Sequence, residues 1–336
     1  MIDPKFSWES TAILNVGLDL GLFRNLIYAE FDYYDRLTTG MIRPSDLSDF
    51  LFGYYPPRVN VGNLRNRGFE TNITLNKQIG EVKLRTNFNF SYNFNRLEKW
   101  NEYLSRGNEF IDMPYRYIYT YLDQGLVQSW NEIYENPLQA DFIAPGDVLL
   151  TDMNGDGFVN GDDRVAFPHM MQRRPTINSS LTGNMEWKGF DLTVFLNATA
   201  GRYDFWGDNL TTTRPRDNRF NFSEFHWTDT WNYYNREASM PRLTISAGDD
   251  GGRNTSDSEY WLQNRSFIRL KNVQLGYSLP RNWINKLNIS RFRIYFTADN
   301  LLTLTRWQGI DPEKDTSGDD FYPLLKSYAI GANIEF

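Results

Sequence analysis

The sequence predicts an all-β protein, namely a portion of an antiparallel transmembrane β-barrel with long loops. Three observations predict this fold class. Segments of about 10 residues alternate between apolar and polar side chains, and this is the length of a tilted barrel strand. Short and long connections alternate along the chain. Aromatic residues make up 16% of the sequence, as is typical of a barrel with an aromatic girdle at each membrane surface.

Composition excludes several classes of function. The 336 residues carry a net charge of −7, so a nucleic-acid partner is not expected. The chain has no cysteine and only two histidines, which excludes thiol catalysis and zinc–cysteine sites. No apolar run approaches the length of a transmembrane helix, but barrel strands are only half apolar and escape that test. We find no motif for a catalytic residue, and we predict that the chain is not an enzyme.

Nine segments show strict alternation, with one apolar face and one polar or small face. The clearest is 84–94, where Leu84, Phe88 and Phe90 oppose Asn87 and Asn89. In chain order, the predicted strands cover about 14–22, 27–33, 69–76, 84–94, 181–187, 192–198, 273–279, 292–305 and 327–336. Each is close to the length that crosses a bilayer at a tilt.

The connections between these strands fall into two kinds. Tight or short connections are predicted at 22–25, 77–80, 187–190 and 281–289, and long loops at about 38–65, 96–175, 203–265 and 306–326. Outer-membrane barrels place short turns in the periplasm and long loops outside the cell. Residues 115–128 look strand-like, but a tenth crossing would break the alternation, so we place them within an extracellular loop.

The number of strands indicates an incomplete barrel. Bacterial single-chain barrels usually have an even number of strands, and a sheet with open edges is not viable in lipid. The chain also begins without a basic segment followed by an apolar one, so no secretory signal is predicted. Residues 1–336 are therefore predicted to be the C-terminal portion of a larger barrel.

The last predicted strand ends the chain on an aromatic residue. Its apolar face carries Tyr328, Ile330, Ile334 and Phe336. A terminal aromatic is stabilised in the interfacial girdle of a barrel, whereas a frayed soluble terminus gains little from it. We interpret these four residues as the outer-membrane assembly signal.

An acidic, glycine-rich segment from Asp152 to Asp163 has the spacing of a calcium-binding loop. The predicted ligands at positions 1, 3, 5, 7, 9 and 12 are Asp152, Asn154, Asp156, the carbonyl group of Phe158, Asn160 and Asp163. An aspartate at position 12 reaches less far than the usual glutamate, so a weak structural Ca²⁺ site, of order 10⁻⁴ M, is expected. The alternative is a polar turn that binds no metal.

The predicted loops also contain clustered aromatic residues. Trp206, Trp227, Trp231 and Tyr233 are candidates to stack against sugar rings. They could equally pack the loops together or contact a partner protein, and the sequence does not decide among these roles. Adjacent acidic pairs, such as Asp249–Asp250 and Asp319–Asp320, are more simply solvated than paired as a glycosidase acid and base.

Eight stretches across the chain occur in the order found in one known family. They are 15–19 with 31–34, 60–70, 123–128, 145–147 leading into 152–157, 187–192, 267–273, 300–303 and 309–313. With these stretches the chain resembles the C-terminal part of the SusC/RagA-like TonB-dependent outer-membrane transporters of Bacteroidetes. It departs from the family pattern in lacking a signal peptide, a TonB box and a plug domain.

The resemblance implies a bacterial outer-membrane barrel of about 22 strands that surrounds an N-terminal plug. It further implies import of glycan or peptide fragments, energised by the TonB complex, with a SusD-like surface lipoprotein as partner and lid. Transport by this chain alone is not expected, because the plug is missing. The alternative is a soluble, secreted, calcium-dependent carbohydrate-binding β-protein. The apolar faces of the strands distinguish the two, since they form an exposed band in a barrel and are buried against a second layer in a soluble protein.

Overall fold

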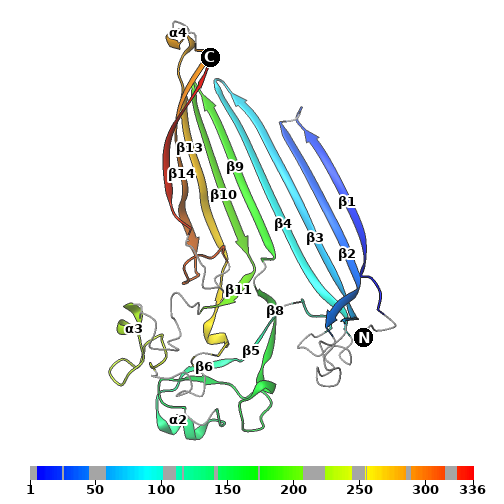
Figure 1. Ribbon diagram of the computed structural model, residues 1–336, viewed down its shortest axis with the longest axis vertical. Helices are drawn as coiled ribbons and strands as arrows, with labels where there is room; N and C mark the ends of the chain where they lie inside the picture. The colour runs from blue at the N-terminus through cyan, green and yellow to red at the C-terminus, as the bar shows by residue number, and fades with distance from the viewer. Residues whose placement is uncertain are drawn as a thin grey trace.

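The computed structural model describes residues 6–24, 26–44, 58–100, 111–115, 117–139, 143–172, 175–206, 224–243, 254, 256–284, 289–314 and 324–336. A nine-stranded antiparallel sheet dominates it (Figure 1). In order across the sheet, its strands are β1 (Ser10–Leu22), β2 (Ile27–Pro44), β3 (Arg58–Ile79), β4 (Val82–Trp100), β9 (Ile177–Trp187), β10 (Phe190–Ala200), β13 (Phe267–Ser278), β14 (Arg291–Thr305) and β15 (Ser327–Glu335). The nine predicted strands and their antiparallel order are confirmed.

A layer of smaller elements lies at one end of the large sheet, and we call it the loop layer (Figure 1). It contains a four-stranded sheet in the order β12-β11-β8-β5 and the β6–β7 pair. The strands are β5 (Tyr117–Thr120), β6 (Asp123–Leu126), β7 (Val148–Leu150), β8 (Val165–Gln172), β11 (Arg202–Phe205) and β12 (Leu262–Asn264). Its short helices are α2 (Trp130–Glu135), η1 (Gly161–Asp163), α3 (Glu224–Thr228) and η3 (Glu259–Trp261). The strand-like segment 115–128 therefore belongs to this layer, as predicted.

The connections at the opposite end of the sheet are short. The Lys188–Gly189 turn has positive φ at both residues, 47° and 86°, which matches the primed turns that join twisted strands. Gly80 (φ 58°) serves the turn between β3 and β4 in the same way. Helix α4 (Arg281–Ile284) lies in the longest of these connections. The predicted alternation of short and long connections is confirmed for the described residues.

The strand register places apolar side chains in continuous rows across the sheet. One row in the middle of the sheet pairs Ile73 with Phe88, Phe88 with Leu181, and Leu181 with Leu196. The apolar face is open: Leu14 is 60% exposed on β1 and Ile330 is 81% exposed on β15. Within the described residues no second layer covers this face. The face therefore has the exposure that contact with lipid requires, and it does not have the burial that a soluble β-protein needs.

Three strands of the large sheet extend into segments that the sequence assigned to long loops. Residues 38–44, 58–65 and 96–100 were expected in loops, but they continue β2, β3 and β4. The apolar alternation becomes irregular there, because polar, glycine and charged residues interrupt it, while backbone pairing continues. Asp35 accepts hydrogen bonds from Arg65 and Arg67 just beyond the aromatic pair Phe69–Tyr92. The remaining parts of these two loops, 45–57 and 101–110, lie outside the described residues.

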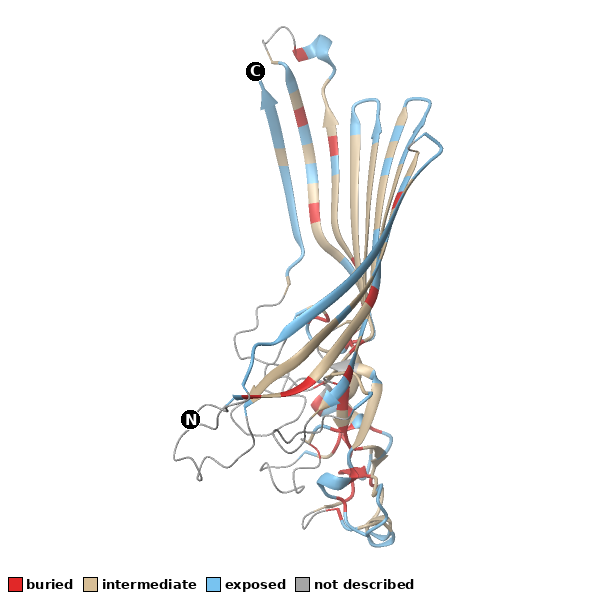
Figure 2. Cartoon of the chain, turned by 90° about the vertical axis from the view of Figure 1, so that its right-hand side faces the viewer, coloured by how far each residue is buried: buried red, intermediate tan, exposed pale blue. Residues whose placement is uncertain are grey.

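The hydrophobic core lies in the loop layer (Figure 2). One buried cluster contains Tyr121, Val148, Leu150 and Val159, and a second contains Trp206, Met240, Trp261 and Trp307. The large sheet has few buried residues, because described residues leave its apolar face open and cover its polar face only near the loop layer, at Arg269. β1 and β15 form its two edges, and no described strand pairs with the free side of either. No helix among the described residues is long and apolar enough to cross a membrane.

Candidate functional site on the polar face and in the loop layer

The second face of the large sheet carries a continuous row of polar side chains. Strand register joins Glu30 to Asn72, Asn72 to Asn89, Asn89 to Ser180, and Ser180 to Asn197. Side-chain hydrogen bonds run along this row, since Asn72 Nδ2 donates to Glu30 Oε2 at 2.9 Å. The sequence places the row here because strand residues two apart share a face.

A cavity of about 440 Å³ lies on this polar face. Its lining residues are Glu30, Asp32, Glu70, Thr71, Asn72, Asn89, Phe90, Ser91, Asn178, Ser179, Ser180 and Asn197. Amide groups donate and accept hydrogen bonds, whereas ionised carboxylates only accept them. Both histidines of the chain lie in the loop layer, in β8 and α3. The cavity thus offers a polar surface for a hydrogen-bonding solute or protein segment, without a serine–histidine pair for acyl transfer.

The charge of the polar face changes toward the short turns. A second cavity, of about 600 Å³, is lined there by Lys83 and Arg85 together with Asn184 and Glu186. Lys83 lies 3.5 Å from Glu186, so part of this charge is paired. Any group held against the sheet would meet carboxylates near the middle and cationic side chains near the turns.

The predicted calcium-binding segment forms a compact loop in the loop layer. Its carboxylates accept backbone N–H groups: Asp152 accepts from Gly155 at 2.7 Å and from Gly157 at 2.9 Å, and Asp156 accepts from Phe158 at 2.8 Å. Gly157 has φ 87°, in the left-handed region that favours glycine. Asp152 is half-buried, whereas Asn154 and Asp156 are exposed on the surface of the loop.

Asp163, the last residue of this loop, ties its two ends together. It is fully buried and accepts hydrogen bonds from the backbone N–H groups of Met153, Asn154 and Asn160. Burial acts to raise the pKa of Asp163, but these three donors outweigh it and hold the pKa below its usual range. Within the described residues, no group of three or more Asp, Glu, His or Cys side chains converges as a metal site would. Calcium binding by these residues therefore stays a prediction.

The four aromatic candidates divide into two pairs. Trp206 and Trp231 are 8% and 5% exposed, so they pack the loop layer and offer little surface to a ligand. Trp231 Nε1 donates to Gln128 Oε1 at 3.1 Å, which ties two loop segments together. Trp227 and Tyr233 are 79% and 68% exposed. Ligand contact stays a prediction for this exposed pair alone.

The predicted assembly signal lies on the edge strand β15. Tyr328, Ile330 and Ile334 point out of the apolar face, and Phe336 is 90% exposed. Among the described strands β15 pairs with β14 alone, so its outer side is available to a further strand. The role of these four residues as an assembly signal stays a prediction.

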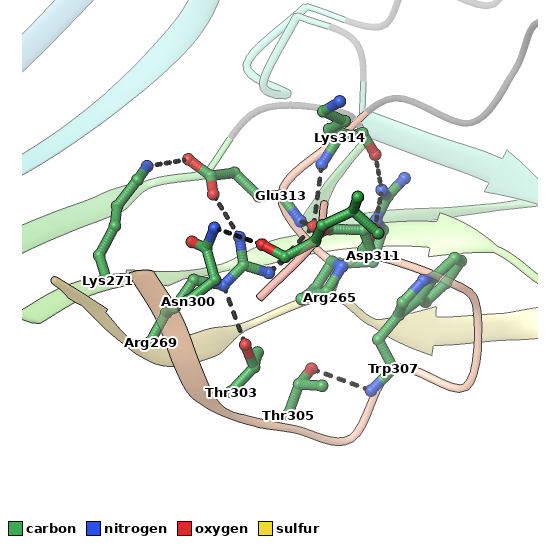
Figure 3. A network of polar contacts seen from close by, with 12 residues as sticks. Arg265, Arg269, Lys271, Asn300, Thr303, Thr305, Trp307, Asp311, Glu313 and Lys314 are labelled. Atoms are coloured by element: carbon green, nitrogen blue, oxygen red, sulfur yellow. Dashed lines mark hydrogen bonds and ion pairs between the residues drawn. The ribbon is translucent and has the colours of Figure 1, made fainter. Parts of the chain in front are cut away.

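Sequence reasoning missed a buried ionic network between β13 and the segment that follows β14 (Figure 3). Arg269 lies on the polar face, where it pairs in register with Asn197 and Thr303. Its guanidinium group contacts Asp311 and Glu313. These residues occur in two of the stretches that carry the family resemblance, 267–273 and 309–313. Arg269 and Asp311 are 42 residues apart, so no local sequence pattern could indicate their contact.

A second buried network lies inside the loop layer. Asp147, which is completely buried, accepts hydrogen bonds from Arg242 Nε at 2.6 Å and Arg242 Nη2 at 2.9 Å. It also accepts from Asn254 Nδ2 at 2.8 Å and from the backbone N–H of Ala144 at 2.8 Å. One carboxylate thus joins three segments that are distant in the sequence.

A two-sided antiparallel sheet with an exposed apolar face, a polar face and a loop layer at one end has the features that the wall of an outer-membrane β-barrel requires. No protein-family model matches the chain. Curated relatives do match almost all of it. TonB-dependent receptor P3 of Formosa agariphila is 26% identical over 99% of this chain and 35% of its own length. TonB-dependent receptor SusC of Bacteroides thetaiotaomicron is 24% identical over 99% of this chain and 32% of its own length.

The solved structure of the RagAB peptide transporter shares the fold. It superposes with a TM-score of 0.77 at 24% identity, over 99% of this chain and 36% of the matched chain. Over its whole length, the chain therefore matches about one third of the length of TonB-dependent receptors such as P3 and SusC. Such receptors reside in the bacterial outer membrane and are transporters without enzymatic activity.

Proposed function

We propose that this chain forms part of the wall of a TonB-dependent transporter that imports glycan or peptide fragments across the outer membrane. The two-sided sheet is the observation that carries the proposal. Its apolar face is exposed in continuous rows, and its polar face holds a cavity of about 440 Å³. One face suits lipid and the other suits a water-filled or protein-filled interior.

The side chains of the polar face favour binding of a solute that has many hydrogen-bonding groups. Sugars and peptides both offer alternating donors and acceptors, and Asn72, Asn89 and Asn197 can serve either kind. One solved relative is described as a peptide transporter. The exposed rings of Trp227 and Tyr233 would add stacking contacts in the loop layer.

A SusD-like surface lipoprotein is the proposed partner at the loop layer. The solved relative is a two-component assembly, RagAB. In this chain Trp227, Tyr233 and Tyr234 are at least 68% exposed in one short segment of the loop layer, and aromatic residues are enriched at protein interfaces. Coupling to the TonB complex would use the part of a receptor that lies beyond the third matched here.

Uptake by the receptor in the outer membrane tests this function. We expect labelled oligosaccharides or oligopeptides to enter cells only when TonB is present. Removing both exposed rings, Trp227→Ala with Tyr233→Ala, should lower uptake at least several-fold because stacking contacts are worth about 1 kcal/mol each. Trp283→Ala, which removes an equally exposed ring at the short-turn end of the sheet, is the matched control. The proposal fails if neither class of solute is taken up.

We also propose that Ca²⁺ orders the loop from Asp152 to Asp163. The spacing of its oxygen ligands supports this, as does the position of Asp163, whose carboxylate accepts backbone N–H groups from both halves of the loop. Millimolar Ca²⁺ should slow proteolysis of the loop layer, and a chelator should reverse the effect. Asp152→Ala with Asp156→Ala should abolish the response. Asp162→Ala, which removes an exposed carboxylate at a position that is not a predicted ligand, should keep it. Protection that is independent of Ca²⁺ would leave the loop as a metal-free turn.

A further inference from the structure

The segment that follows β14 turns back toward the large sheet, and we call Trp307–Lys314 the strap. Arg269 holds it from the polar face of β13. Arg269 Nη2 donates to both carboxylate oxygens of Asp311 at 3.1 Å, and Nη1 donates to Glu313 Oε2 at 2.6 Å (Figure 3). Lys271 Nζ donates to Glu313 Oε1 at 2.9 Å. Because Arg269 pairs with Asn197 on the polar face and is the third residue of β13, which begins at the loop layer, the strap lies against the loop-layer end of the polar face.

Two further arginines hold the backbone of the strap. Arg265, which is completely buried, donates to the carbonyl oxygen of Asp311 at 3.0 Å and also to that of Lys314. Arg202 donates to the carbonyl oxygen of Glu313 at 3.0 Å. The backbone carbonyl groups of the strap therefore accept hydrogen bonds from guanidinium groups, whereas those of a free loop would accept them from water. Arg265 is itself paired with Asp204 at 2.8 Å, so its charge is compensated.

Packing fixes the start of the strap. The guanidinium carbon of Arg265 lies 4.5 Å from the centre of the Trp307 ring, which belongs to the buried tryptophan cluster. Gln308 and Gln263 exchange two hydrogen bonds, at 3.0 and 3.1 Å. Both ends of the strap are thus anchored to the segment 262–265.

These contacts distinguish a fixed strap from a mobile lid. Arg269 and Asp311 are 2% and 4% exposed. Opening the strap would separate buried Arg269 from Asp311 and would deprive Arg269 and Arg265 of the acceptors that the strap supplies, which is strongly unfavourable. We propose that Trp307–Lys314 is a fixed constriction, which narrows the solute path at the loop-layer end of the polar face. The position of the strap stands on its contacts alone, whereas its effect on a solute path rests on the proposed function.

Limited proteolysis of the receptor in outer-membrane vesicles tests whether the strap is fixed. Trypsin cleaves after lysine, and Lys314 ends the strap. We expect Arg269→Gln to raise the rate of cleavage after Lys314 at least tenfold. Arg291→Gln, which removes an exposed arginine paired with Glu335 at 3.5 Å, should leave the rate unchanged. Heat-modifiable migration in gels shows that each variant has assembled. An unchanged rate in assembled Arg269→Gln would overturn the proposal.

A reversible tether supplies the second measurement. Because these 336 residues contain no cysteine, Gln263→Cys with Gln308→Cys introduces the two thiols of this chain. A short, reducible bis-thiosulfonate linker should join them in the assembled receptor. In the Arg269→Gln background, the tether should restore protection from trypsin, and a reductant should remove it. Failure of the thiols to join would contradict a strap held against 262–265.

Single-channel conductance in planar bilayers tests the constriction itself. Arg269→Gln should increase conductance, and the tether should bring it back to the level of the parent protein. A released strap with unchanged conductance would show that the strap does not narrow the path. Failure of the transport proposal is a separate outcome, because it would appear as absent uptake while proteolysis and tethering still behave as expected.

Discussion

Leu181→Arg is expected to destabilise the assembled protein by about 2–4 kcal/mol. Leu181 lies in the central row of the apolar face, between Phe88 and Leu196. A guanidinium group at this depth of a bilayer must lose its hydration or distort the lipid around it. The measurement is the urea midpoint of folding into lipid vesicles, with the outer-membrane level of the protein in cells as a second readout.

Thr182→Arg is the matched control, because it places the same charge one residue along the same strand. Thr182 pairs with Asn87 and belongs to the polar face. Its arginine can reach water or polar groups, so a change of less than about 1 kcal/mol is expected. Equal losses from the two substitutions would contradict the assignment of one face to lipid.

Asp147→Ala is expected to destabilise the loop layer by about 3–5 kcal/mol, the usual effect of removing one partner from a buried ion pair. The substitution leaves Arg242, Asn254 and the N–H of Ala144 without their common acceptor. The large sheet should persist, since its strands pair independently of this network. The expected result is faster proteolysis of the loop layer at unchanged outer-membrane abundance.

Two further variants identify the cause of the destabilisation that is expected for Asp147→Ala. Glu135→Ala removes an exposed carboxylate from the same layer and should have almost no effect. Asp147→Leu combined with Arg242→Met replaces the ion pair with apolar groups and should recover part of the stability. If Asp147→Ala were as resistant to proteolysis as the parent chain, the buried pair would not hold the loops together.

The large sheet could be predicted because its signal is local. Alternation with a period of two residues located all nine strands, and the odd–even pattern of 84–94 and 181–187 assigned their faces correctly. The limits of β2, β3 and β4 could not be predicted in the same way. Beyond Phe69 the outward side chains become charged, as Arg67 and Arg65 show, while backbone pairing continues without an apolar signal.

The loop layer was far less predictable, because its structure rests on contacts between distant residues. Arg269 and Asp311 are separated by 42 positions, and Asp147 and Asn254 by 107. The burial of Trp206 and Trp231 also depends on partners from other loops, such as Trp261 and Gln128. Composition showed that tryptophans were present in the loops but could not separate packed rings from exposed ones.

The most direct test of the central claim is a spin-label scan along β9 of the protein in lipid. Single cysteines at 177–187 carry the label, since the chain has none of its own. Oxygen, which concentrates in lipid, should collide most with labels at odd positions, such as 179, 181 and 185. A water-soluble nickel complex should collide most at even positions, such as 180, 182 and 184. Apolar positions shielded from both reagents, as in a core buried against a second layer, would contradict the account of this chain as an outer-membrane wall.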